Sequence, residues 1–357
     1  MRRRFAAAAV GAAATLLSAC GSSGGGGSSS PPGGSAGGSA AGSGAGSAAP
    51  SAAAGTYVNP VWDQDFPDPA VLAAGGRFYA YATQGGGKNI QTLTSSDLVH
   101  WRPGPDALPD VGRWASVGNT WAPEVIRLGN RYVMYYVARA DEPGKQCVGR
   151  ATASSPGGPF VDSSAAPLVC QAALGGSIDP NPVRAADGAL YLYWKNDGNC
   201  CGQPVHLWGQ RMTADGARLT GRPVALMTND KPWQGNLVEA PEMVRHGSAY
   251  VLFYSANDYA SPLYGIGYAT CTGPLGPCTD RSTASLVPSN DAAAGPGHCF
   301  VLNLPGGATW MLYHAWPPDA VGSQSPGRLL WMEPVTWSGS TPKVHASDPS
   351  AQPAPEL

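Results

Sequence analysis

The sequence has little charge and no basic stripe. Only 13% of its 357 residues are Asp, Glu, Lys or Arg, and the formal net charge is −2. A nucleic-acid-binding chain needs clustered Lys and Arg to neutralise phosphates, so a nucleic-acid partner is excluded. No long segment after residue 55 keeps a helical period, whereas 48 Gly, 34 Pro, 11 Trp and 14 Tyr are present. This balance favours an all-β, turn-rich fold.

Motifs for nucleotides, zinc and activated nucleophiles are also missing. Nothing resembles a P-loop, a dinucleotide fingerprint, the metalloprotease pattern HExxH or the serine-hydrolase pattern GxSxG. The cysteine spacings are not those of a zinc site. We therefore expect no organic cofactor, and any chemistry must come from carboxylates or from a bound ion.

The first twenty residues form a targeting segment rather than part of the fold. Three arginines (residues 2–4) precede an apolar run at residues 5–17, which is too short to span a bilayer comfortably. The run ends in Leu17-Ser18-Ala19-Cys20, which resembles the lipobox of bacterial lipoproteins. We predict a signal peptide over residues 1–20 and a lipid anchor on Cys20. The alternative is an ordinary secretory cleavage site, which would release the protein.

Residues 21–55 contain only Gly, Ser, Ala and Pro, so they predict a flexible tether. The protein is thus expected to be exported to the cell envelope and to touch a membrane only through its anchor. Export makes disulfides plausible. The pairings predicted first are Cys147–Cys170 and Cys271–Cys278. Cys200 and Cys201 are left open: they could form a vicinal disulfide, or one could pair with Cys299.

A five-fold repeat organises the rest of the chain. Alternating strands rich in aromatic residues start 54, 58, 60 and 60 residues apart, at residues 78–83, 132–138, 190–196, 250–256 and 310–315. A Gly-containing turn and another short apolar strand precede each one, so every unit opens with a β-hairpin. Repeats of this length indicate a stacked or radial architecture.

About thirty-five further residues in each unit can supply two more strands. The predicted fold is a five-bladed β-propeller over residues 56–345, with four antiparallel strands per blade around a central channel. Residues 346–357 are predicted to be a C-terminal tail. The repeated aromatic side chains are interpreted as packing layers between blades.

Ionisable residues stand at the head of each repeat. The chain reads Pro67-Asp68-Pro69 before the first strand and His298 before the last, and the other units carry Glu124, Asp179 and Glu239. Because innermost strands line the channel, these five residues are expected to converge at one of its mouths. Asp68 lies between two prolines and is predicted to be extended.

The blocks around these residues resemble the ordered signatures of glycoside hydrolase family 43. They are residues 65–70, 121–125, 177–180, 239–241 and 295–298, and the resemblance covers most of residues 57–340. It implies inverting hydrolysis of α-L-arabinofuranosyl or β-xylosyl linkages in plant polysaccharides. It further implies a separation of roughly 6.5–9.5 Å between the two reacting carboxyl groups.

The resemblance also implies roles. Asp68 matches the general base, Glu239 the general acid, and Asp179 the carboxylate that tunes and orients the acid. His298 matches a channel histidine associated with a calcium ion or its water shell. Substrate-binding positions are predicted at Trp121, Glu124, Trp233 and Asn236, although a structural role is favoured for Glu124.

Two other readings stay open at this stage. One is a retaining fructosidase on a related five-bladed propeller, although the acid block continues Glu239-Ala240-Pro241 where Glu-Cys is expected. The other is a non-catalytic carbohydrate-binding lipoprotein, since a fold alone does not fix function.

Overall fold

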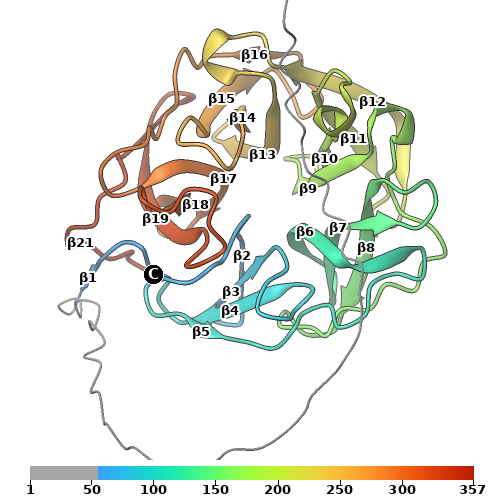
Figure 1. Ribbon diagram of the computed structural model, residues 1–357, viewed down its shortest axis with the longest axis horizontal. Helices are drawn as coiled ribbons and strands as arrows, with labels where there is room; N and C mark the ends of the chain where they lie inside the picture. Colours follow the sequence, from blue (N-terminus) through green and yellow to red (C-terminus); the bar gives the residue numbers. More distant parts are fainter. Residues whose placement is uncertain (1–54) are drawn as a thin grey trace, which may run out of the picture. The chain divides into compact units, whose positions relative to one another are not determined.

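The computed structural model describes residues 55–357, which form a closed ring of antiparallel sheets (Figure 1). The predicted signal peptide, Cys20 and nearly all of the tether lie outside the described residues. Five sheets of three or four strands surround a centre, and their innermost strands are β2, β6, β9, β13 and β17. The five-bladed β-propeller predicted from the repeat is confirmed.

The strands follow one another along each blade from the centre outwards. Blade 1 contains β2 (Ala70–Ala74), β3 (Arg77–Ala82), β4 (Gln91–Ser95) and β5 (Arg102–Pro103). Blade 2 contains β6 (Ala115–Leu128), β7 (Arg131–Ala140) and β8 (Gln146–Ala153). Its fourth position is reduced to isolated bridges, in which Val161 pairs with Thr152 and Val169 with Val148.

The other three blades have four strands each. Blade 3 contains β9 (Ser177–Arg184), β10 (Leu190–Asn196), β11 (His206–Met212) and β12 (Leu219–Thr228). Blade 4 contains β13 (Val238–His246), β14 (Ala249–Ala256), β15 (Gly265–Cys271) and β16 (Cys278–Asp280). Blade 5 contains β17 (Ala294–Asn303), β18 (Thr309–Trp316), β19 (Leu329–Ser338) and β20 (Thr341–Val344).

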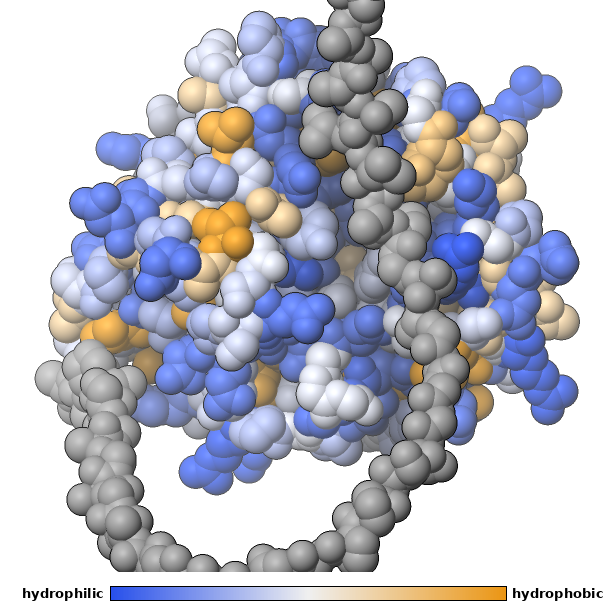
Figure 2. All heavy atoms as spheres, in the orientation of Figure 1, coloured by the Kyte–Doolittle hydropathy of each residue, from blue (hydrophilic) through white to orange (hydrophobic). Residues whose placement is uncertain are grey.

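Helical structure in residues 55–357 is limited to three short 3-10 turns. They are η1 (Ala172–Leu174), η2 (Gly198–Cys201) and η3 (Pro232–Gln234). Within this part of the chain, no helix has the length and apolar character needed to cross a membrane. The face seen in Figure 2 is mostly hydrophilic, and its apolar side chains are scattered.

The core is divided into five clusters, each made of side chains from two neighbouring blades. The second-strand aromatics fill them: Tyr136 lies between blades 1 and 2, for example, and Tyr313 between blades 4 and 5. The interpretation of the aromatic repeat as packing between blades is therefore correct. The two disulfides predicted first, Cys147–Cys170 and Cys271–Cys278, are both formed, whereas Cys200, Cys201 and Cys299 are free thiols.

The two ends of the described chain close the ring together. The segment before blade 1 pairs with β19, because Val61 N donates to Leu330 O at 2.9 Å and Asn59 Nδ2 donates to Met332 O at 2.9 Å. The predicted C-terminal tail is not separate: its β21 (Gln352–Pro353) pairs with β1 (Thr56–Tyr57). The tail thus completes the fold, because it supplies the partner for the first strand.

Glu333 makes this closure pH-dependent. Its side chain is fully buried, and Oε1 accepts hydrogen bonds from Asn59 Nδ2 (3.0 Å) and Asp348 N (3.1 Å). Burial raises the pKa of Glu333 from 4.5 to about 7. The folded state therefore holds a proton that the unfolded state releases above pH 4.5, so stability falls as the pH rises from about 4.5 to about 7.

Glu333→Gln should remove this dependence. Melting temperatures measured at pH 5 and pH 8 should differ less in the variant than in the wild type. The exposed Glu142→Gln variant is the control and should keep the wild-type difference. An unchanged pH difference in Glu333→Gln would contradict the assignment.

Candidate active site

One backbone irregularity recurs near the same end of all five inner strands. Each blade has one non-glycine residue with positive φ there: Asp68 (56°), Ala122 (37°), Asp179 (55°), Ala240 (51°) and His298 (46°). In blades 2 to 5 the register of the inner hairpin shifts beside this residue, as in a β-bulge. Such backbone costs energy and re-aims side chains, and it is typical of functional sites.

This finding corrects two sequence predictions. Asp68 is not extended, because its φ of 56° lies in the left-handed region. The five predicted residues also do not share one register: Ala122 and Ala240 hold the equivalent positions in blades 2 and 4. Glu239 lies one residue before its blade's left-handed position, and Glu124 lies two residues after.

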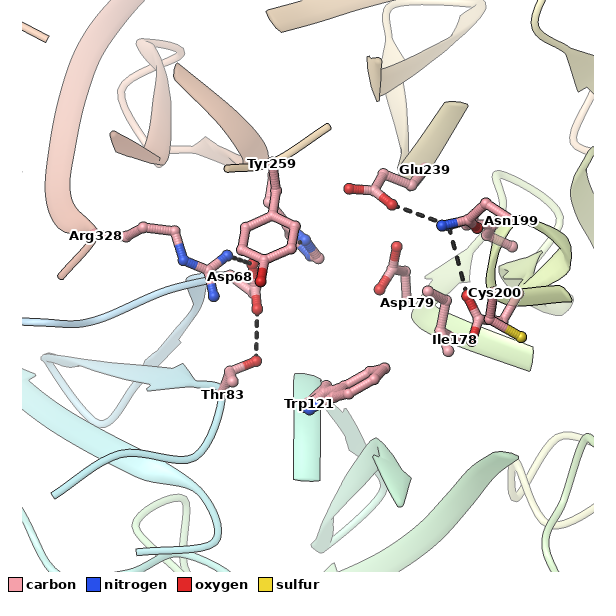
Figure 3. Close-up of a pocket in the computed structure, with 13 residues that line it drawn as sticks. Asp68, Thr83, Trp121, Ile178, Asp179, Asn199, Cys200, Glu239, Tyr259 and Arg328 are labelled. Atoms are coloured by element: carbon pink, nitrogen blue, oxygen red, sulfur yellow. Dashed lines mark hydrogen bonds and ion pairs between the residues drawn. The ribbon is translucent and has the colours of Figure 1, made fainter. Parts of the chain in front are cut away.

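Asp68, Asp179 and Glu239 nevertheless converge on one cavity of about 340 Å³, which suits one small ligand. Figure 3 shows the carboxyl group of Asp68 on one side of this space and those of Asp179 and Glu239 on the other. Trp121 and His298 line the same cavity. Other residues of its wall were not predicted from the sequence as site residues, among them Thr83, Lys195, Tyr259 and Arg328.

Asp68 is surrounded by hydrogen-bond donors and cations. Thr83 Oγ1 donates to Oδ2 at 2.6 Å, and Arg328 Nη1 donates to Oδ1 at 2.8 Å. His298 Nδ1 lies 3.3 Å from Oδ1. Burial disfavours the ionised carboxylate, but Arg328 and His298 outweigh it and hold the pKa of Asp68 well below its usual range. Asp68 is therefore ionised at any pH near neutrality.

His314 supports Asp68 from behind. Its ring is fully buried, and Nδ1 accepts a hydrogen bond from Asp68 N at 3.1 Å. Burial, together with the Arg328 charge, lowers the pKa of His314 to about 4. The ring is therefore neutral near pH 7, which leaves the Nδ1 lone pair free to fix the left-handed backbone of Asp68.

Glu239 has a different environment. Tyr264 donates its phenol to Oε1 at 2.8 Å, and the fully buried Lys195 donates its ammonium to Oε2 at 3.0 Å. The Tyr264 ring lies where a side chain at position 297 would stand, since a Cβ on Gly297 would come within 1.9 Å of it. Glycine at position 297 is therefore what admits the residue that orients Glu239.

Asp179 lies beside Glu239. Its Oδ2 accepts a hydrogen bond from Ala240 N at 2.9 Å, so it contacts the backbone next to Glu239. Burial and the Glu239 charge raise the pKa of Asp179 to about 6, against the opposing effects of His298 and Lys195. Asp179 is thus coupled to Glu239 in two ways, through the backbone of Ala240 and through the charges of the two carboxyl groups.

The remaining predicted positions lie away from the cavity lining. Glu124 lies deeper in the channel, where Asn181 Nδ2 donates to both its oxygens (3.2 and 3.1 Å). Trp233 packs on Tyr254 and donates to Ser282 O at 3.1 Å, so it serves the core of blade 4. Asn236 is exposed outside the cavity. Of the four predicted binding positions, only Trp121 lines the cavity, and the place of Glu124 agrees with the structural role favoured for it.

The residues near His298 do not form a protein cage for calcium. Ca²⁺ takes six to eight oxygen ligands, whereas here an imidazole nitrogen faces a carboxylate oxygen that already binds Arg328. Residues 55–357 contain no group of three or more His, Cys, Asp or Glu side chains placed to hold a metal ion. Calcium therefore stays a prediction of the resemblance.

Comparison with known proteins identifies the arrangement. The model of the glycosyl hydrolases family 43 matches residues 57–342. The chain belongs to this family. A crystal structure of a thermostable family-43 glycoside hydrolase superposes with a TM-score of 0.77 at 31% identity, covering 85% of this chain and all of the other. The family match favours the hydrolase over the fructosidase and binding-protein readings.

Two curated relatives of this family-43 chain are more distant. A putative beta-xylosidase of Xylanibacter ruminicola is 26% identical over 81% of this chain, and the chain spans half the length of that relative. A probable arabinan endo-1,5-alpha-L-arabinosidase A of Aspergillus flavus is 24% identical over 78% of this chain and 90% of its own length. The names of the two relatives refer to different sugars.

Proposed function

We propose that this family-43 enzyme hydrolyses α-L-arabinofuranosyl or β-xylosyl linkages of plant polysaccharides with inversion at the anomeric carbon. The observation that carries the proposal is the pair of carboxyl groups on opposite sides of one cavity. Asp68 is ionised and held by cations, whereas Glu239 is oriented by Tyr264 and stands beside Asp179. Two carboxyl groups with different surroundings are what acid and base roles require.

In the proposed reaction, a water molecule lies between Asp68 and the anomeric carbon. Asp68 accepts a proton from this water as its oxygen forms the new bond to carbon. The bond from carbon to the departing oxygen breaks on the opposite face, and Glu239 gives that oxygen its proton. Asp179 orients Glu239 through the backbone of Ala240, and Lys195 holds its other oxygen.

A substrate panel tests the proposal directly. Nitrophenyl α-L-arabinofuranoside, nitrophenyl β-xyloside, arabinan and xylan should separate the arabinose- and xylose-releasing activities. Proton NMR at early times should show the product with the anomeric configuration opposite to that of the substrate. A product of retained configuration would overturn the inverting mechanism, and inertness toward all four substrates would overturn the substrate class.

Trp121 supplies the apolar face that a sugar ring needs. It lines the cavity and is only partly buried. Trp121→Ala should raise KM about tenfold, because losing a stacked aromatic face costs on the order of 1–2 kcal/mol. The control is Trp233→Phe, whose indole lies outside the cavity and whose KM should be unchanged. An equal rise in both variants would contradict the placement.

We also propose that the enzyme is exported and acts at the cell envelope, anchored through Cys20. The signal-like leader supports export, and one relative, from Bacillus subtilis, is named an extracellular endo-α-(1→5)-L-arabinanase. The two disulfides fit an oxidising compartment. Metabolic labelling with a fatty acid, followed by Cys20→Ser, would show whether the anchor exists.

A further inference from the structure

Two adjacent thiols lie beside the active-site cavity, and one of them forms part of its wall. η2, which follows β10 in blade 3, carries Cys200 and Cys201. Both are exposed free thiols, and Cys200 lines the cavity beside Asn199 (Figure 3). The remaining free thiol of the described chain, Cys299, is buried on β17. A small oxidant could therefore reach this pair while Cys299 stays protected.

The two sulfur atoms have different neighbours. Lys145 Nζ lies 3.4 Å from Cys201 Sγ, and a cation there stabilises a thiolate as it forms. Cys200 Sγ donates instead to Gly175 O at 3.6 Å, and burial, Cys201 and Asp197 together raise the pKa of Cys200 to about 12. Cys201 is thus placed to attack first, and Cys200 to react second.

A disulfide between them would be strained. Adjacent Cα atoms lie about 3.8 Å apart, whereas disulfides prefer separations of about 4.4–6.8 Å. Strained, exposed disulfides are the readily reduced ones, so such a bond can open again. The surroundings leave little slack: a Cβ on Gly175 would lie 2.2 Å from Asp197 O and 3.1 Å from Cys201 Sγ. Closing the ring must therefore displace the cavity wall.

We propose that Cys200 and Cys201 form a reversible oxidation site that alters the active-site cavity. The Cys201 thiolate attacks a low-molecular-weight disulfide, forms a mixed disulfide and expels one thiolate. Cys200 then gives up its proton and attacks Cys201 Sγ, which closes the vicinal disulfide and expels the second thiol. Two electrons pass from the protein to the small disulfide, and an excess of small thiol reverses both steps.

Oxidation reaches the reacting carboxyl group through short contacts. The disulfide removes the thiol hydrogen that Cys201 donates to the backbone oxygen of Asp197, with Sγ and O 4.0 Å apart. Asp197 Oδ1 lies 3.9 Å from Lys195 Nζ, which in turn holds Glu239 at 3.0 Å. A change in the thiol contact to Asp197 therefore alters the positions of Lys195 and Glu239. The expected result is weaker catalysis in the oxidised form, and this part rests on the proposed function.

The test uses the mature chain incubated with oxidised glutathione. Peptide mapping by mass spectrometry should show the 200–201 peptide losing the mass of two hydrogens, with no lasting glutathione adduct. The kcat/KM for nitrophenyl α-L-arabinofuranoside or β-xyloside should fall about threefold or more and recover with excess reduced glutathione. Cys201→Ser, whose side chain is not part of the cavity lining, should keep the reduced activity and lose the response.

Two results would overturn the proposal. One is that Cys200 and Cys201 both keep their thiol hydrogens at every ratio of oxidised to reduced glutathione, or that the reaction stops at the glutathione adduct. The other is a closed disulfide that leaves kcat and KM unchanged. The mass measurement needs no substrate, so it is decided even if the sugar specificity differs from that proposed.

Discussion

Glu239→Gln should lower kcat on arabino- or xylo-oligosaccharides by at least about 10³-fold, because a general acid contributes about 10²–10⁴ to such a step. An unactivated sugar alcohol leaves poorly as an anion and needs a proton as the bond breaks. Glutamine keeps the size of the side chain and can still accept from Tyr264, so the cavity should persist. The variant removes the proton, and it also removes the charge that pairs with the buried Lys195.

The leaving group separates this role from a structural one. A dinitrophenyl glycoside departs as a stable phenolate and needs no protonation, so Glu239→Gln should retain its activity to within about tenfold. Loss of equal size on both substrates would show that Glu239 does not act as the acid. The exposed Glu142→Gln variant is the matched control and should behave as wild type on both.

Asp68→Asn should lose about 10³-fold or more on both kinds of substrate. The base is needed whichever group departs, because the attacking water must lose a proton in every case. An amide in this position cannot accept that proton, and its NH₂ group faces Arg328, His298 or Thr83. Activity toward the dinitrophenyl glycoside is thus the measurement that distinguishes Asp68→Asn from Glu239→Gln.

A change of fold must be excluded for Asp68→Asn, since the carboxylate holds two neighbouring blades together. The melting temperature and the near-ultraviolet circular dichroism of the variant should be compared with those of the surface variant Asp187→Asn. A folded Asp68→Asn protein with wild-type turnover of the dinitrophenyl substrate would contradict the base assignment. A folded protein inert toward it would support the assignment.

The sequence predicts the frame of the site well. Every blade needs aromatic side chains to pack against its neighbours. The aromatic pattern therefore repeats along the sequence, and its period can be counted there. The three carboxylates stand at the head of those repeats, next to a proline or one residue away from it, so Asp68, Asp179 and Glu239 could be predicted. Trp121 was visible for the same reason. These features are local in the chain, and local features are what a single sequence displays.

The missed residues follow from contacts between blades. Thr83, Lys195, Ser255 and His314 occupy matching positions in the aromatic strands, opposite the inner-strand bulges. The sequence shows them only as polar residues at or near the ends of the aromatic strands at 78–83, 190–196, 250–256 and 310–315. Arg328 had no such signal, because it lies on the loop before β19 and reaches Asp68 only through ring closure.

Glu124, Trp233 and Asn236 do not line the cavity, for a different reason. Proximity in sequence to a reacting residue does not fix the face on which a side chain emerges. The left-handed residue in each inner strand shifts the register, so Glu124 points deeper into the channel. A rule of alternation cannot anticipate that shift, because Ala122 and Ala240 give no hint of positive φ.

Three of these strand-end residues also hold the backbone of the following blade, and this bears on protein engineering. Thr83 Oγ1 accepts from Ala122 N, Ser255 Oγ from His298 N, and His314 Nδ1 from Asp68 N, so each side chain secures the left-handed residue of the following blade. A single blade taken from another member of the family would bring its left-handed residue. It would lack the side chain of the preceding blade that holds this residue by a hydrogen bond. Chimeras made to change sugar preference should therefore exchange neighbouring blades as pairs.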